Sequence, residues 1–321
     1  MTQTTSPHVR GEVSDGLARL VLDRPRAINA LDVAMMQAIG ELLTAWREDD
    51  DVQRVEISGE GERGFCSGAD VRAIRQLVLD EPQRAVDFFE HEYTVNRLIA
   101  HYPKPTTAHL HGVSMGGGLG LALHCRTVTA ERDLVLAMPE TGIGLFPDVG
   151  INWQLSHTPG ELGTWMAMTG QSIDAASALY AGLVDELTPS PADDLSAEAS
   201  QLERDRAWID ECFTGDDPVA VVTALEAHDQ ARARECAELL RSRSPWSVAV
   251  ALEAVRRSAR VDSVDEVLEQ DARLARNYVA DSDFVEGVRA QLVDKDRNPQ
   301  WRHACVEDVP RELVLGMFEA R

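Results

Sequence analysis

The chain has 321 residues, of which 44% are hydrophobic and 26% are charged, a composition typical of a globular enzyme with a substantial core. Its 31 basic and 54 acidic side chains give a formal net charge of −23. Such a balance argues against nucleic acid and anionic membranes as partners, because both are bound through basic surfaces. We interpret it as a solubility feature that still allows an anionic ligand held by a few local arginines and helix N-termini.

The first half of the chain alternates predicted strands and helices. Two apolar-rich segments, 9–13 and 17–22, flank Ser14-Asp15-Gly16 and indicate a hairpin, and helical spacing from Asp32 to Trp46 predicts a helix with Asp32 as its N-cap. Further strands are predicted at 55–57, 106–110, 128–129 and 134–137, and further helices at 71–79, 82–101 and 119–124. This alternation predicts an α/β domain with crossover connections through about residue 188.

The second part of the chain is predicted to be helical. The composition shifts to Pro, Ser and Asp over Thr188–Ala197, which indicates a linker, and we therefore divide the chain into residues 1–190 and 191–321. Beyond the linker, helical spacing recurs at 220–227, 231–241, 246–258 and 264–279.

Cysteine usage and the N-terminus bear on the cellular setting. The five cysteines are scattered and odd in number, so neither a disulfide framework nor a metal site is expected. Residues 1–10 lack a basic stretch followed by an apolar run, and no apolar run reaches the roughly 18 residues of a membrane helix. We expect a cytoplasmic protein.

Two glycine-rich segments, Phe65–Asp70 and Gly112–Gly118, each join a strand to a helix. The free N–H groups at the start of a helix point outward, so two such turns can aim two donors at one carbonyl oxygen. The alternative is that the glycines only permit tight turns and close packing. A dinucleotide fingerprint is disfavoured, because Leu121 stands where its third glycine is required.

Two acids, Glu140 and Asp148, lie eight residues apart in an otherwise apolar loop punctuated by glycine and proline, residues 137–150. Such a loop should partly bury both carboxylates and raise their pKa values, which suits acid–base or nucleophilic chemistry. The alternative makes Glu140 a helix-capping acid and Asp148 a turn former.

Together, these segments resemble the hallmark motifs of the crotonase (enoyl-CoA hydratase/isomerase) superfamily, in family order over residues 10–190. The resemblance rests on Arg24–Leu31, Phe65–Arg72, His111–Gly118 and Met138–Pro147. It implies an α/β fold, the crotonase-type spiral of ββα units, with a C-terminal helical region. It also implies an acyl-CoA substrate, with coenzyme A as part of that substrate and no permanently bound cofactor. Hydratases of the superfamily usually form trimers and hexamers, which leaves a homo-oligomer open.

The resemblance also implies roles for individual residues. The backbone N–H groups of Ala69 and Gly117 would form an oxyanion hole for the thioester carbonyl, with Gly116 beside the acyl group. The coenzyme-A channel would be lined by residues of two segments, namely Arg24, Arg26, Ala27, Asn29, Cys66, Gly68, Ala69 and Asp70. Without a clear histidine partner, the Cys66 thiol is interpreted as a packing group rather than a nucleophile.

Within the superfamily, the chain is most similar to the 3-hydroxyisobutyryl-CoA hydrolases. Hydratases need two glutamates; the second matches Glu140, whereas Gly120 stands at the position of the first. The hydrolases instead carry an aspartate in a stretch that Leu145–Gly150 matches, which assigns substrate contact to Asp148. Glu92, in the acidic segment 88–93, matches a substrate-contacting glutamate, and residues 283–290 and 292–301 resemble the closing signature of the hydrolases.

The implied reaction is hydrolysis of a short branched 3-hydroxyacyl-CoA, with 3-hydroxyisobutyryl-CoA in valine breakdown as the expected substrate. Glu140 would attack the carbonyl or act as base on water, and Asp148 would orient the substrate hydroxyl or the water. Glu92 would help to hold the hydroxyacyl group. Two alternatives remain open: a hydratase or isomerase with Glu140 as its principal acid/base, and a crotonase-like scaffold that binds coenzyme A or a partner without turnover.

Overall fold

The computed structural model describes residues 6–188 and 200–319, which form two compact units whose segments alternate along the chain. The first unit comprises the described residues of 1–70, 90–137 and 173–201, and the second those of 71–89, 138–172 and 202–321. Of the predicted linker, all but Thr188 lies outside the described residues, so the division near residue 190 stays a prediction.

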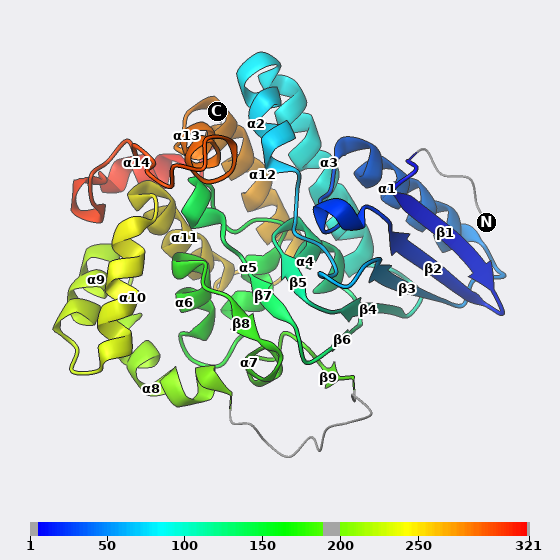
Figure 1. Ribbon diagram of the computed structural model, residues 1–321, viewed down its shortest axis with the longest axis horizontal. Coiled ribbons are helices and arrows are strands. Elements are labelled where there is room, and N and C mark those ends of the chain that lie inside the picture. Colours follow the sequence, from blue (N-terminus) through cyan, green and yellow to red (C-terminus); the bar gives the residue numbers. More distant parts are fainter. Residues whose placement is uncertain (1–5, 189–199, 320–321) are drawn as a thin grey trace. The chain divides into compact units, whose positions relative to one another are not determined.

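The first unit contains a six-stranded sheet with the order β1-β2-β3-β4-β6-β9, shown in Figure 1. Its strands are β1 (Val9–Ser14), β2 (Leu17–Leu22), β3 (Arg54–Gly59), β4 (Thr106–Leu110), β6 (Thr127–Ala130) and β9 (Glu186–Leu187). The predicted hairpin is confirmed: β1 and β2 are antiparallel, and Asp15 and Gly16 between them both have positive φ, which suits a two-residue loop. Every other neighbouring pair is parallel and therefore needs a crossover connection.

A second, three-stranded sheet accounts for the expected spiral course of the chain. It has the order β5-β7-β8, with β5 (Val113–Met115), β7 (Val135–Ala137) and β8 (Ile173–Asp174), and β5 and β7 are parallel. The chain passes from β4 into β5 and from β6 into β7, and after β3 the extended residue Cys66 makes a parallel bridge with Ser114. Each pass of the chain thus contributes one extended segment to the six-stranded sheet (β3, β4 or β6) and one to, or beside, the three-stranded sheet (Cys66, β5 or β7). This arrangement confirms the predicted α/β crotonase-type fold.

Helices complete the first unit. Helix α1 (Val33–Glu48) begins as predicted, since the Asp32 carboxylate accepts the Met35 N–H at 2.9 Å. Helix α4 (Gly117–Ala122) begins two residues earlier than predicted. Glycine has low helix propensity, so the pattern alone placed the start at Leu119, whereas burial of the whole segment keeps Gly117 and Gly118 helical. The remaining helices that contribute are α7 (Ala175–Tyr180) and the second half of α3 (Pro82–Ala100).

The regular elements of the second unit are all helices among its described residues. The predicted helices correspond to α2 (Val71–Asp80), the first half of α3, α9 (Pro218–Ala227), α10 (Ala231–Ser242), α11 (Pro245–Ser258) and α12 (Val264–Ala280). Helices that were not predicted are α5 (Ile151–Ser156), α6 (Leu162–Thr169), α8 (Gln201–Cys212) and α14 (Arg311–Gly316). Helix α13 (Phe284–Val288) lies in the charged tail 283–301, whose composition alone indicates a helix and a loop. All residues of α6 are buried, so it lacks the amphipathic period that identifies a surface helix.

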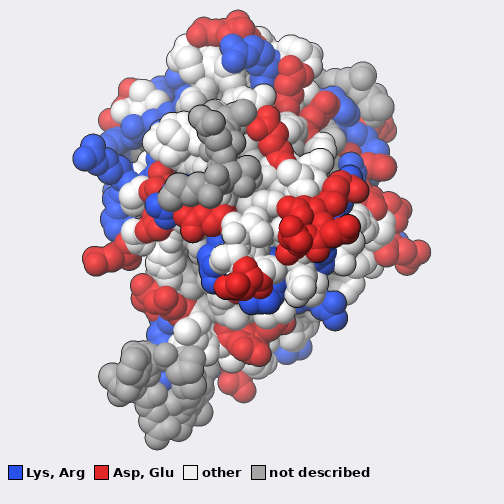
Figure 2. All heavy atoms as spheres, turned by 90° about the vertical axis from the view of Figure 1, so that its right-hand side faces the viewer, with Lys and Arg blue, Asp and Glu red and all other residues white. Residues whose placement is uncertain are grey.

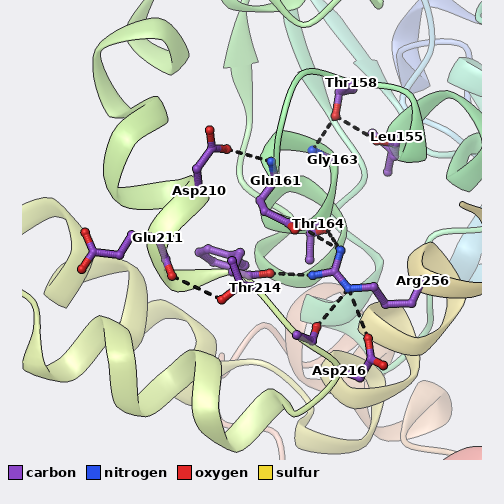
Figure 3. A network of polar contacts seen from close by, with 12 residues as sticks. Leu155, Thr158, Glu161, Gly163, Thr164, Asp210, Glu211, Thr214, Asp216 and Arg256 are labelled. Carbon is purple, nitrogen blue, oxygen red and sulfur yellow. Dashed lines mark hydrogen bonds and ion pairs between the residues drawn. The ribbon is translucent and has the colours of Figure 1, made fainter.

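Arg256 on α11 ties together α6 and the segment that follows α8 (Figure 3). Its guanidinium donates to the Glu161 carboxylate at 2.8 Å, to the Phe213 carbonyl at 2.6 Å and to the Gly215 carbonyl at 2.9 Å. Arg256 is mostly buried, so these bonds are poorly screened by solvent. The fork of the guanidinium matches several acceptors at once, which an ammonium group would not.

The surface agrees with the acidic composition. Figure 2 shows acidic side chains in several groups on one face, with basic side chains dispersed among them. In the first unit, for example, Arg10 forms an ion pair with Asp23 at 3.1 Å. Within the described part of the chain, no helix is long and apolar enough to cross a membrane.

Replacing Arg256 by alanine should lower the free energy of unfolding by about 2 kcal/mol, because it removes the charged donor of the partly buried Glu161 carboxylate and of the Phe213 carbonyl. Arg256→Lys should recover only part of this loss. Arg260→Ala is the matched control. Arg260 is exposed, and among the described residues its guanidinium is paired only with Asp216, at 3.5 Å, so its loss should change stability by about 0.5 kcal/mol or less. Urea unfolding of the three variants measures the difference, and equal losses for Arg256→Ala and Arg260→Ala would show that the network contributes no stability.

Candidate active site

The two glycine-rich segments lie side by side in the first unit. The Phe65 N–H donates to the His111 carbonyl at 2.9 Å, the Cys66 N–H to the Val113 carbonyl at 3.2 Å, and the Met115 N–H to the Cys66 carbonyl at 2.9 Å. These bonds pair the start of one segment with β5, immediately before the other segment enters α4. The pairing fixes where each segment turns.

This pairing brings the backbone nitrogens of Ala69 and Gly117 near each other. A Cβ built at Gly117 would lie 3.6 Å from the Ala69 nitrogen, and one built at Gly68 would lie 3.3 Å from the Gly117 nitrogen. Within residues 6–188 and 200–319, neither N–H donates a hydrogen bond to a protein acceptor. Two neighbouring backbone donors without acceptors are what an oxyanion hole requires.

From the sequence, the glycines could serve either to present backbone donors or to permit close packing. The structure assigns packing to Gly118 and places Gly117 beside a carboxylate. A Cβ at Gly118 would lie 2.6 Å from the Cys66 Cβ, so this glycine serves close packing. A side chain at Gly117 would instead collide with the Glu92 Oε1 atom. Glu92, on α3, is 1% exposed. The structure therefore brings the predicted substrate glutamate to the predicted oxyanion residue. Gly116, the N-cap of α4, directly precedes Gly117 and has φ of 51°.

Asn96 was not identified from the sequence. It lies one turn beyond Glu92 on α3 and is 0% exposed, and neither atom of its carboxamide has a hydrogen-bond partner among the described residues. Residues four apart lie on one helix face, so Asn96 neighbours the site. A polar residue four positions after Glu92, on a stripe that also holds Phe89 and Ile99, was the signal that could have found it.

Asn29 connects the N-terminal motif to the first glycine-rich segment. Its Oδ1 accepts the Arg24 N–H at 2.8 Å, and its Nδ2 donates to the Glu60 carbonyl at 3.0 Å and the Phe65 carbonyl at 2.9 Å. The Arg24 guanidinium forms an ion pair with Asp70 at 3.0 Å. The predicted coenzyme-A segments are thus held together within one unit.

Exposure separates the predicted coenzyme-A residues into two groups. Asn29, Cys66 and Gly68 are buried and hold the segments, whereas the other five reach the surface at least partly: Arg24, Arg26, Ala27, Ala69 and Asp70. Burial raises the pKa of the Cys66 thiol to about 12, so it is no thiolate nucleophile. The packing interpretation of Cys66 is confirmed, and the contacts of these eight residues with coenzyme A stay a prediction.

The two predicted acids lie in the second unit. Glu140 begins a short 3-10 turn, η2 (Glu140–Ile143), and is 6% exposed; Asp148 precedes α5 and is 4% exposed. Burial raises the pKa of Glu140 well above its usual range, and the neighbouring charge of Asp148 raises it further. The predicted burial of both acids is confirmed, and so is the raised pKa of Glu140.

A third buried acid, Asp271 on α12, was missed. It accepts the Gly150 N–H at 2.7 Å, and burial, followed by the charge of Asp148, raises its pKa well above the usual range. Its position on the apolar stripe of α12, between Val267 and Leu274, was the signal in the sequence.

The predicted closing signature packs against η2. At Gly287, on α13, a side chain would collide with the Ile143 carbonyl, so only glycine allows this approach. Asp283 accepts hydrogen bonds from the Ser244 hydroxyl at 2.7 Å and the Arg302 N–H at 2.9 Å, and the Ser244 N–H donates to the Thr141 carbonyl at 3.1 Å. The signature thereby fixes the turn that carries Glu140.

Arg289 fixes the remainder of the signature. Its guanidinium contacts the carboxylates of Glu286 at 2.8 Å, Asp294 at 2.6 Å and Asp296 at 2.7 Å. The charged tail is therefore an ordered loop held on one cation. Among the described residues, no three His, Cys, Asp or Glu side chains are placed to hold a metal ion.

The comparisons with known proteins agree with this arrangement. A family model described as enoyl-CoA hydratase/isomerase matches residues 17–199 and 190–318. Curated relatives include the mitochondrial 3-hydroxyisobutyryl-CoA hydrolase of Danio rerio, 34% identical over 94% of this chain and 86% of the relative. The mitochondrial 3-hydroxyisobutyryl-CoA hydrolase of Homo sapiens is 31% identical over 94% of this chain and 86% of the relative.

Two solved structures are similar over nearly the whole chain. One is a carnitinyl-CoA dehydratase from Mycobacterium thermoresistibile, 38% identical, with a TM-score of 0.92 and coverage of 98% of this chain and 97% of that one. The other is an enoyl-CoA hydratase from Rhodobacter sphaeroides, 33% identical, with the same TM-score and coverage.

The raised pKa of Glu140 predicts a pH-dependent stability. A carboxyl whose folded-state pKa is raised stabilises the fold fully below its unfolded pKa of about 4.3, and this contribution is lost as pH rises toward the folded value. In that window Glu140→Gln should remove a decline of up to about 1.4 kcal/mol per pH unit. Unfolding free energies of wild type and variant between pH 4 and about pH 8 measure the difference.

Glu253→Gln is the control with opposite sign. Although burial acts the other way, hydrogen bonds and charge from Arg257 and Arg311 lower the pKa of Glu253. Its stabilisation is present above the unfolded pKa and is lost as pH falls. If Glu140→Gln leaves the wild-type slope unchanged, Glu140 is not protonated in the folded state over this range.

Proposed function

The chain belongs to the enoyl-CoA hydratase/isomerase family, and within it we propose that it hydrolyses a short branched 3-hydroxyacyl-CoA, with 3-hydroxyisobutyryl-CoA as the substrate. The observation that carries this proposal is the buried pair of acids, Glu140 and Asp148, combined with Gly120 at the position where a hydratase needs its first glutamate. The names of the curated relatives support the same activity.

The backbone donors would act on the carbonyl. The Ala69 and Gly117 N–H groups polarise the thioester oxygen and stabilise the oxyanion of the tetrahedral intermediate, and loss of one such donor typically costs ~10²–10³ in rate. Glu92, beside Gly117, accepts a hydrogen bond from the substrate hydroxyl and so favours 3-hydroxyacyl groups.

Glu140, assisted by Asp148, would bring about cleavage of the thioester C–S bond by one of two routes. In the first, ionised Glu140 takes a proton from water, the oxygen of which attacks the carbonyl carbon; the C–S bond then breaks and the proton passes to the departing thiolate. In the second, the Glu140 carboxylate attacks, expels the thiolate and forms a mixed anhydride, which water hydrolyses. Asp148 orients the water or the substrate hydroxyl in both routes. Heavy oxygen from water appears in the Glu140 carboxylate only by the second.

The proposal extends to the setting. The enzyme would need no permanently bound cofactor, because coenzyme A arrives and leaves with the substrate, and it would act in valine breakdown in the cytoplasm, as a homo-oligomer or a monomer. The curated animal relatives cited above are named mitochondrial. The division into a core of residues 1–190 and a helical region of 191–321 remains part of this proposal.

One observation favours a second candidate function. The Mycobacterium structure, 38% identical, is named a dehydratase, and a dehydratase of this family would use Glu140 as its principal acid/base. Against it stands Gly120, which lies buried in α4 and offers no carboxylate. A scaffold without turnover is the remaining alternative.

A two-substrate assay separates these functions. Wild type should release thiol from 3-hydroxyisobutyryl-CoA, and Glu140→Gln should lower kcat/KM at least 10³-fold, because it removes the base or nucleophile. Asp148→Asn should lower it roughly 10–100-fold. Loss of enoyl absorbance from crotonyl-CoA without thiol release would instead show a hydratase, and neither signal would leave the scaffold. Asp217→Asn, at the exposed cap of α9, is the control and should be unchanged.

The same reaction should show a specific pH dependence. Glu140 must be ionised to act, so kcat/KM should rise with pH on an acidic limb set by its raised pKa. Asp148→Asn removes a negative charge that raises this pKa, so the limb of that variant should move to lower pH. An acidic limb that stays in place would mean that another group controls it.

A further inference from the structure

We propose that Asp271 is a positioning residue for Asp148: it stands in the fold as a neutral acid and holds the Asp148–Gly150 turn through the Gly150 amide. The inference rests on the proposed function, in which Asp148 orients the substrate or the water. None of the sequence motifs includes Asp271, which lies more than a hundred residues beyond that turn.

The Asp148–Gly150 turn is a strained piece of backbone. Val149 has φ of 55° and Gly150 has φ of 74°, so two successive residues occupy the left-handed region, which a β-branched residue rarely adopts. The Ile151 N–H bonds the Asp148 carbonyl at 3.0 Å, and the Asn152 Nδ2 bonds the Pro147 carbonyl at 2.6 Å. Both bonds join residues close together in sequence, so these two bonds stabilise the turn locally.

Asp271 supplies a long-range contact to this turn. Its Oδ2 accepts the Gly150 N–H at 2.7 Å, and its side chain is fully buried on the stripe of α12 that also carries Leu268 and Leu274. The bond connects residues 121 positions apart in sequence. It ties the strained turn to a 17-residue helix, and Asp148 lies two residues from the bonded amide.

The surroundings of Asp271 favour its neutral form. Its Oδ1 is buried and has no hydrogen-bond partner in the described part of the chain, and no cation there forms an ion pair with it. An ionised carboxylate in such a position would bear an uncompensated charge, whereas a neutral acid bears none. Burial and the charge of Asp148 raise its pKa in the same direction.

The other titratable groups nearby do not offset this. Helix α11 packs against α12, but its Arg256 and Arg257 are engaged by Glu161 and Glu253. Among the described residues, the charge that acts on Asp271 is that of Asp148, which also acts on Glu140, and both of these groups are acids. A neutral Asp271 therefore accepts the Gly150 N–H without placing a further negative charge beside Asp148.

Two substitutions separate a neutral from a charged Asp271. Asp271→Asn keeps a neutral oxygen acceptor of the same shape, so kcat/KM should stay within about threefold of wild type and the acidic limb of its pH profile should not move. Asp271→Ala removes the acceptor and should lower kcat/KM at least tenfold. An Asp271→Asn variant as impaired as Asp271→Ala, or with a displaced acidic limb, would overturn the neutral assignment. A folded Asp271→Ala variant with wild-type kcat/KM would overturn the positioning role.

A measurement without turnover separates this inference from the proposed function. The infrared difference spectrum of wild type minus Asp271→Asn at pH 7 should show the carbonyl stretch of a protonated carboxyl group. The matched control is Asp205→Asn, since Asp205 is a buried acid ion-paired with Arg232 at 2.8 Å and should show only carboxylate bands. If wild type releases no thiol but the protonated band is present, the proposed function fails and the neutral assignment stands; absence of the band overturns the assignment itself.

Discussion

The pairing of residues 65–66 with the 111–115 segment is the constraint on which the two backbone donors of the first unit, at Ala69 and Gly117, depend. One glycine-rich segment alone would offer a single backbone N–H, and a single donor does not fix the position of a carbonyl oxygen. Both segments are needed. Backbone hydrogen bonds between Phe65, Cys66 and β5 set the register, and the register sets the separation of the Ala69 and Gly117 nitrogens. The same bonds are those that a spiral of ββα turns needs between successive layers. The fold and the placement of these two backbone donors thus depend on one set of interactions.

The second unit differs in that it holds several acids in an apolar environment. Each buried carboxyl costs free energy unless it is neutral or receives hydrogen bonds, and mutual repulsion makes simultaneous ionisation of neighbours still less favourable. Glu140 and Asp271 both respond with raised pKa values, whereas Glu253 and Asp205 are instead paired with arginines. The helices of this unit therefore contain two kinds of buried acid. Those that are paired with cations stabilise the fold, and those that are not are the ones expected at a reactive site.

How much could be predicted from the sequence depends on whether a pattern is local. The hairpin, the Asp32 cap and the amphipathic helices follow from short-range periodicity and turn chemistry, and all are confirmed. Helix α6 is not predicted, because it is buried on every side and shows no amphipathic pattern. Strand β5 is not predicted, because it has only three residues. Among candidate site residues, Glu140 and Asp148 stand out as acids in an apolar loop. Asp271 does not, because its contact with Gly150 spans 121 positions in sequence. Asn96 does not, because only the folded chain shows that its carboxamide is buried without a hydrogen-bond partner among the described residues.

The closing signature shows why a charged tail can matter as much as a buried motif. By composition, residues 283–301 would form an exposed helix and loop of little consequence. Yet Gly287 allows α13 to approach the Ile143 carbonyl, and Ser244, which donates to Asp283, also donates to the Thr141 carbonyl of η2. Arg289 forms ion pairs with three carboxylates that would otherwise repel one another. A turn as short as η2 has little intrinsic stability, so the orientation of Glu140 must be imposed by its surroundings. The contacts of these residues impose it. The spacing of the closing signature is therefore set by the need to hold Glu140, an acid far earlier in the chain.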